Sequence, residues 1–256
     1  MNDQPIPVLL YHSVPRTANG ADPLCVPYER FSAQLETILD SGRTPVTVGE
    51  IAAGLRGEHA LPERAVAITF DDAYEDTPDA VELLCERGLR ADVYVTTGQI
   101  GTAAMITHEQ LRRLATRPHE VELGAHSVTH PHLDELTRSE IEREVSASKE
   151  QLEQLIGRRV DTFAYPYGSY DSRVRAAVLA AGFRSAAAVK NALSHRHDDP
   201  WAIARWTVRT TTEPRQIAEL LEGRGAPHAW RHERLRTRGY RAARRFRRTL
   251  AHSARS

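Results

Sequence analysis

The segment AVAITFDDAYED, from Ala65 to Asp76, carries the strongest indication of the fold. Its first six residues are apolar or β-branched, a composition typical of a strand buried on both faces of a parallel sheet. Two adjacent aspartates, Asp71 and Asp72, follow this run directly. Buried carboxylates need a partner, so the strand end predicts either a cation site or the N-terminal cap of the next helix.

Strand-like and helix-like segments alternate at least five times along the chain, which favours a parallel α/β architecture, either a barrel or a doubly wound sheet. The expected strands are 7–12, 65–70, 91–97, 120–127, 162–168, 184–189 and 202–208. The expected helices are 28–42, 77–88, 108–116, 138–157 and 172–183.

Polar or turn-forming residues follow four of these strands at the point where each ends. They are His12, the pair Asp71 and Asp72, His126, and the tripeptide 166–168. In parallel α/β folds the carboxyl ends of the strands share one rim, where sites are built. We therefore expect these residues to lie together.

The segment HSVTH places His126 and His130 four residues apart. Two imidazoles and one carboxylate from another strand make three ligands for a divalent ion and leave positions open for catalysis. Histidines at this spacing also occur as ordinary surface or core residues, and the Asp pair could serve as a helix cap. The two motifs together favour the metal.

The segments TFDDAYED, HSVTHPHL and FAYPYGSYD resemble, in order, the first three motifs of the polysaccharide deacetylases, the NodB-homology enzymes of carbohydrate esterase family 4. The resemblance covers roughly residues 5 to 210. It implies a distorted, TIM-like (β/α)7 barrel and metal-dependent hydrolysis of the linear C–N amide bond of an N-acetylated sugar.

Carried over residue by residue, the resemblance makes Asp71 the general base and makes Asp72, His126 and His130 the metal ligands. The main-chain N–H of Tyr167 would help to hold the oxyanion. Zinc suits two histidines and a carboxylate best, while cobalt, nickel and iron also fit.

The chain departs from the family pattern at three places. Ala73 stands where glycine is usual, and Ala164 stands where an arginine often orients the base. We expect Arg205, in the last strand, to replace that arginine. The late histidine that acts as the acid is missing.

We expect His12 to replace the missing acid, because the first and last strands of a closed barrel are neighbours. The opening LLYHSV also resembles the poly-N-acetylglucosamine deacetylase branch, in which the motif order is permuted and the acid comes early. Trp201 is a candidate for stacking on a sugar, with a core position as the alternative.

The formal net charge of zero conceals a basic end, since 11 arginines and a single acid follow from Arg224 onward. We expect a barrel over residues 1–222 and an arginine-rich tail over 223–256. The tail could be solvated, could lie on an anionic membrane surface, or could bind nucleic acid, the least favoured of the three. Neither a signal peptide nor an apolar run of membrane-spanning length is apparent. We therefore expect a cytoplasmic protein, peripheral to the inner membrane face if the tail binds lipid.

The expected function is removal of N-acetyl groups from an amino-sugar saccharide. The alternatives are deformylation or deacetylation of a lipid-linked sugar or another non-peptide amide, and a barrel that binds saccharides without catalysis.

Overall fold

The computed structural model describes residues 4–17 and 22–230. Its strands are β1 (Val8–Tyr11), β2 (Thr44–Pro45), β3 (Ala65–Phe70), β4 (Ala91–Val95), β5 (Val121–Ala125), β6 (Thr162–Ala164), β7 (Ser185–Val189) and β8 (Ile203–Thr207). Its helices are α1 (Tyr28–Asp40), α2 (Val48–Leu55), α3 (Thr77–Cys85), α4 (His108–Ala115), α5 (Arg138–Ile156), α6 (Ser172–Ala180) and α7 (Pro214–Leu221). Three single turns of 3-10 helix are η1 (Thr97–Gln99), η2 (Leu133–Glu135) and η3 (Pro166–Gly168).

The strands close into a parallel barrel, which settles the choice between a barrel and a doubly wound sheet. The order around it is β1, β8, β7, β6, β5, β4 and β3, and β3 pairs back onto β1. Strand β1 closes the barrel by pairing on both of its edges. Leu9 is opposite Trp206 of β8 on one edge, and Val8 is opposite Ala67 of β3 on the other. The first and last strands are therefore neighbours, as expected.

The short strand β2 stands outside the closed ring. It pairs with the start of β3, whereas β4 pairs with the end of β3. Two residues, one of them Pro45, are too few to show an alternating pattern, so the sequence gives no signal for β2.

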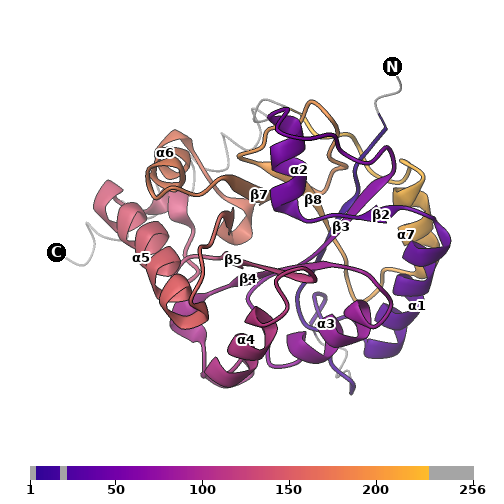
Figure 1. Ribbon diagram of the computed structural model, residues 1–256, viewed down its shortest axis with the longest axis horizontal. Coiled ribbons are helices and arrows are strands. Elements are labelled where there is room, and N and C mark those ends of the chain that lie inside the picture. Colours follow the sequence, from indigo (N-terminus) through magenta and orange to yellow (C-terminus); the bar gives the residue numbers. More distant parts are fainter. Residues whose placement is uncertain (1–3, 18–21, 231–256) are drawn as a thin grey trace, which may run out of the picture.

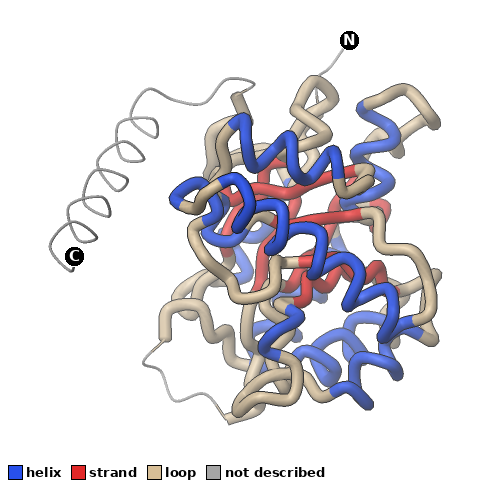
Figure 2. The backbone as a smooth tube through the Cα atoms, turned by 90° about the vertical axis from the view of Figure 1, so that its left-hand side faces the viewer, coloured by secondary structure: helices blue, strands red, loops and turns tan. Residues whose placement is uncertain are grey.

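Helices cover the outside of the barrel, and Figure 1 shows α1 lying beside α7 across the closure. The same layering is seen from the side in Figure 2. A smaller apolar cluster fills the inside, where Val8, Ala67 and Ile203 from the strands meet Val48 and Ile51 of α2. Helix α2 therefore packs its apolar face against the cluster inside the barrel rather than onto the outer surface of the barrel.

The sequence reading located five of the seven helices of the described chain within a few residues and omitted α2 and α7. The long helix expected over 138–157 is α5, which begins with a capping box between Thr137 and Glu140 and ends at Gly157, whose φ is 67°. Among the described residues, none of the helices is both long and apolar enough to cross a membrane.

The C-terminal end of the described chain packs against the barrel. Pro227 and Ala229 follow α7 and bond to Leu193, which lies between β7 and β8. The N–H of Leu193 donates to the carbonyl of Pro227, and its carbonyl accepts from the N–H of Ala229. Residues 231–256, which hold most of the expected basic tail, lie outside the described residues.

Candidate metal centre and active site

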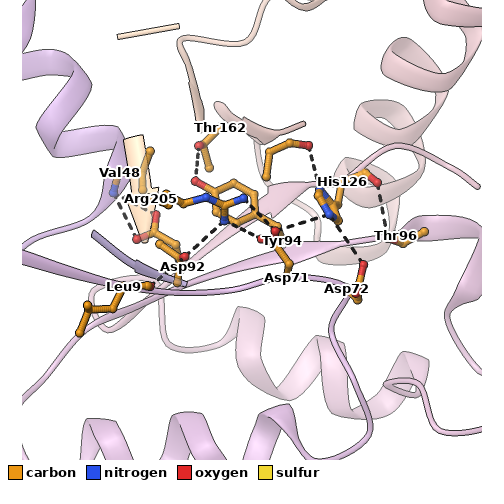
Figure 3. A network of polar contacts seen from close by, with 12 residues as sticks. Leu9, Val48, Asp71, Asp72, Asp92, Tyr94, Thr96, His126, Thr162 and Arg205 are labelled. Carbon is orange, nitrogen blue, oxygen red and sulfur yellow. Dashed lines mark hydrogen bonds and ion pairs between the residues drawn. The ribbon is translucent and has the colours of Figure 1, made fainter. Parts of the chain in front are cut away.

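The rim at the carboxyl ends of the strands brings together Asp72, His126 and His130. The Oδ1 atom of Asp72 lies 3.3 Å from Nε2 of His130 and 3.7 Å from Nε2 of His126. One ligand atom from each residue lies within 4.8 Å of the other two. Figure 3 shows Asp72 and His126 pointing toward one another from β3 and β5.

The chemistry of this group fits a divalent cation. Nδ1 of His126 donates to the carbonyl of Ala164 at 2.8 Å, which leaves the lone pair of Nε2 facing Asp72. Within the described part of the chain, Oδ1 of Asp72 is buried and has no hydrogen-bond partner. Burial, and then the neighbouring His126, lower the pKa of His130 to about 4, which keeps its imidazole neutral and able to act as a ligand.

The turns at Asp72, His130 and Tyr167 adopt left-handed backbone conformations. The φ angles are 69° at Asp72, 61° at Ala73, 59° at His130 and 58° at Tyr167. A non-glycine residue in this region costs roughly 1 kcal/mol or more. The positive φ of Ala73 gives a physical reason for glycine being usual at that motif position.

Asp71 is held by Arg205. The guanidinium donates to both carboxylate oxygens, at 2.6 and 2.8 Å, and both side chains are buried. Burial acts to raise the pKa of Asp71, but the charge and hydrogen bonds of Arg205, together with the neighbouring His126 and His12, outweigh it and lower this pKa to about 2. The arginine thus keeps Asp71 ionised beside the candidate metal ligands Asp72 and His126 (Figure 3).

Arg205 is supported in turn by the interior of the barrel. Its guanidinium carbon lies 5.2 Å from the centre of the Tyr94 ring, and the hydroxyl of Tyr94 is 3.0 Å from Oγ1 of Thr162. The contact between Arg205 and Asp71, expected from the family pattern, is thus made across the barrel, from β8 to the residue that follows β3.

His12 follows β1 and lies close enough to Asp71, Asp72 and Arg205 for their charges to act on its pKa. Burial lowers the pKa of His12, against the opposing effect of the two aspartates. Its Nδ1 is buried without a hydrogen-bond partner among the described residues. The adjoining Ser13 is anchored because its hydroxyl donates to Asp76 at 2.5 Å.

Tyr167 lies on the same rim, in the single turn η3. The residue is 57% exposed, and the centroid of its ring lies 4.0 Å from that of His132 and 4.5 Å from that of His130. Gly168 is required here because a Cβ at this position would lie 2.6 Å from the backbone nitrogen of Val189.

Trp201 is not brought to this rim. It precedes β8, four residues before Arg205, and its carbonyl accepts a hydrogen bond from the hydroxyl of Tyr165. Its side chain is partly buried and packs against the larger apolar cluster, which is distinct from the smaller cluster inside the barrel. Its role in sugar binding stays a prediction.

The sequence reading missed Glu144, a buried acid that binds the turn between His126 and His130. The available signal was its position among Ile141, Val145 and Ser148, which form the buried face of α5. A carboxylate on the buried face of a helix needs a partner, and the nearest functional motif supplies one.

Comparison with protein families gives a match to the polysaccharide deacetylase family over residues 58–186. YxkH of Bacillus subtilis (strain 168) is 26% identical over 201 residues, which cover 78% of this chain and 70% of YxkH. The chitooligosaccharide deacetylase of Azorhizobium caulinodans is 30% identical over 125 residues, 48% of this chain and 57% of that enzyme.

Solved structures share the fold. The deacetylase PplD of Streptococcus pyogenes, solved in complex with acetate, has a TM-score of 0.78 at 21% identity, over 86% of this chain and 100% of PplD. IcaB from Ammonifex degensii has a TM-score of 0.74 at 21% identity, over 86% of this chain and 98% of IcaB. At these identities the likeness concerns the fold: a closed seven-stranded barrel of the NodB type.

Proposed function

Since the chain belongs to the polysaccharide deacetylase family, we propose that it is a metal-dependent hydrolase that removes N-acetyl groups from an amino-sugar saccharide. The observation that carries the proposal is the meeting of Asp71, held by Arg205, with the ligand group Asp72, His126 and His130. A barrel kept only for binding would need neither an ionised buried carboxylate nor three convergent ligand atoms.

Asp72, His126 and His130 would hold the cation, for which zinc is the best candidate and cobalt, nickel or iron are alternatives. A bound divalent ion supplies Lewis acidity, which lowers the pKa of water and polarises a carbonyl oxygen. The remaining chemistry falls to side chains and backbone of this protein.

Asp71 accepts the proton of the attacking water at its carboxylate, which Arg205 keeps ionised and oriented. The main-chain N–H of Tyr167 donates to the oxyanion that forms from the acetyl carbonyl. His12 donates a proton to the leaving nitrogen, and its lowered pKa makes the protonated imidazole a stronger acid. The amide C–N bond breaks, giving acetate and a free amine.

The test is acetate release from short N-acetylglucosamine oligomers by the full-length protein, after chelator treatment and after zinc or cobalt is restored. We expect release to require metal, to be abolished by Asp71→Asn and to fall at least about 100-fold in His12→Ala. Asp79→Asn and His59→Ala, at exposed positions, are the matched controls and should behave as wild type.

No acetate release from a folded, zinc-loaded protein would contradict the proposal for these sugars. The same protein should then be offered formylated and lipid-linked sugars, since those amides would need the same residues. Saccharide binding without hydrolysis of any of them would instead identify a non-catalytic barrel.

A further inference from the structure

The turn from His126 to His130 carries two of the three proposed metal ligands. It follows β5 and includes two left-handed residues, Ser127 with a φ of 63° and His130 with a φ of 59°. Neither is a glycine, so the conformation is strained and must be imposed by its surroundings.

One side of the turn is held by η1. The N–H groups of Thr97 and Gly98 donate to the carbonyls of Ser127 and Val128 at 3.2 and 2.9 Å. Gly98 leaves room for this approach, since a Cβ there would lie 2.6 Å from the carbonyl oxygen of Val128.

The other side is held by Glu144 of α5. Its Oε2 accepts from the N–H of Val128 and from the N–H of Thr129, both at 2.9 Å. Its Oε1 accepts from the hydroxyl of Thr129 at 2.7 Å. A carboxylate that receives three hydrogen bonds, and is only 9% exposed, fixes the turn far more firmly than water could.

The placement of His130 depends on this turn more than that of His126 does. The His126 ring is oriented by its own hydrogen bond to the carbonyl of Ala164. Within residues 4–17 and 22–230, the ring nitrogens of His130 make no hydrogen bond, and its main-chain N–H donates to Oγ of Ser127 at 3.0 Å. Apart from contacts with the rings of Tyr167 and His126, the position of the His130 ring is therefore set by the backbone that Glu144 holds.

We infer that Glu144 is a positioning residue for the ligand His130: it orders the turn so that Nε2 of His130 faces Oδ1 of Asp72. Outer partners of this kind commonly change metal affinity by about 10- to 100-fold when they are removed. The inference rests on the proposed metal site, and it does not depend on which amide is hydrolysed.

Hydrogen bonding and charge can be separated at this position. A glutamine in place of Glu144 would keep an oxygen for the two N–H groups and could donate to the Thr129 hydroxyl, which can turn to accept. A leucine of similar size would keep none of the three bonds. We therefore compare Glu144→Gln with Glu144→Leu, and use Glu142→Gln, on the exposed face of the same helix, as the control.

The experiment measures zinc affinity of the full-length protein by chelator competition, with the thermal unfolding of each metal-free variant recorded alongside. We expect Glu144→Leu to weaken zinc binding at least tenfold, Glu144→Gln by about threefold or less, and Glu142→Gln not at all. In a His130→Ala background, Glu144→Leu should change the remaining affinity by less than about twofold, since its target is gone.

Thr129→Val tests the same contact if Glu144→Leu does not fold, because Thr129 is exposed and its replacement removes only the hydroxyl bond. It should weaken zinc binding by a smaller factor that also disappears with His130→Ala. Unchanged zinc affinity in folded Glu144→Leu, or in Thr129→Val where Glu144→Leu does not fold, would overturn the inference. So would an equal loss in Glu144→Gln and Glu144→Leu, or a loss that persists without His130. If wild-type protein failed to bind zinc, the metal site itself would be wrong, a result separate from any test of deacetylation.

Discussion

At the scale of single residues, the pair Arg205–Asp71 is the contact on which the proposed chemistry depends most. Removing one partner of a buried ion pair leaves the other charge uncompensated, which costs about 3–5 kcal/mol. We expect Arg205→Met to lower the free energy of unfolding by about that amount and kcat/KM at least about 100-fold. Urea denaturation and acetate release measure the two effects.

Arg205→Lys separates charge from geometry at the same position. Lysine keeps the charge but cannot make the two parallel hydrogen bonds to Asp71, so its activity should lie between wild type and Arg205→Met. Arg175→Met, which breaks a half-buried pair with Asp199 away from the rim, is the control. Normal turnover by Arg205→Met would show that Asp71 needs no cationic partner.

Gly168 tests whether the rim depends on the exact path of the turn that carries Tyr167. A Cβ at Gly168 would meet the backbone of Val189 at 2.6 Å, whereas a Cβ at Gly157 has nothing within 4 Å, although both glycines have nearly the same φ. Gly157→Ala should therefore cost only the conformational strain, about 1 kcal/mol. Gly168→Ala should cost more in urea denaturation and should also reduce acetate release; equal behaviour of the two variants would argue against a tightly packed rim.

At the scale of elements, the N-terminus of α2 is held by two acids, Asp92, which is buried, and Glu122, which is partly buried. Asp92 accepts from the N–H of Val48 at 3.1 Å, and Glu122 bonds Thr47 and Gly49. Burial raises the pKa of Asp92 well above its usual value, and burial also raises the pKa of Glu122. Both carboxyls therefore hold their protons more tightly in the folded protein than in the unfolded chain.

The raised pKa of Asp92 predicts how the stability of the protein changes with pH. An acid whose pKa is raised by folding contributes full stability below its unfolded pKa, about 3.9 for aspartate, and loses it as the pH rises toward the folded pKa. In Asp92→Asn that loss is absent. The free energy of unfolding of the variant should therefore rise relative to that of wild type as the pH increases from about 4 to 7. Urea midpoints of the chelator-treated proteins, with the exposed Glu86→Gln as control, measure the difference; a pH-independent difference would contradict it.

The success of the sequence reading also differs between elements. The grouping of the candidate ligands could be predicted because Asp71 and His126 directly follow strands, with Asp72 and His130 in the turns that come next, and parallel strands bring their carboxyl ends together. Helix α2 was omitted because VGEIAAGL contains two glycines, although Thr47 and Glu50 form a capping box that the sequence carries as TVGE. Glu144 could be recognised as a buried acid from its place on α5, but its partners lie 15 and 16 residues earlier in the chain and meet it only in the folded protein.

At the scale of the whole molecule, barrel closure brings distant residues together, and the end of the folded body decides where the C-terminal tail can be removed. Closure places β1 beside β8, and so brings His12 near Arg205 although they are far apart in sequence. The packing of Ala229 against Leu193 shows that the body of the protein continues past residue 222. A truncation that isolates the tail should therefore be made after Trp230, and one made after residue 222 should lose stability.

We expect the 1–230 protein to keep wild-type thermal stability and acetate release from soluble oligomers, because it retains the whole described barrel. If the arginines beyond residue 230 bind membrane, the truncation should lose binding to vesicles rich in anionic lipid, and binding of the full-length protein should weaken as salt is added. Co-sedimentation with anionic and with neutral vesicles measures this. Equal sedimentation of the two proteins would show that the tail does not bind membrane. Salt-sensitive binding by the full-length protein alone would instead favour a sugar substrate held at a lipid surface.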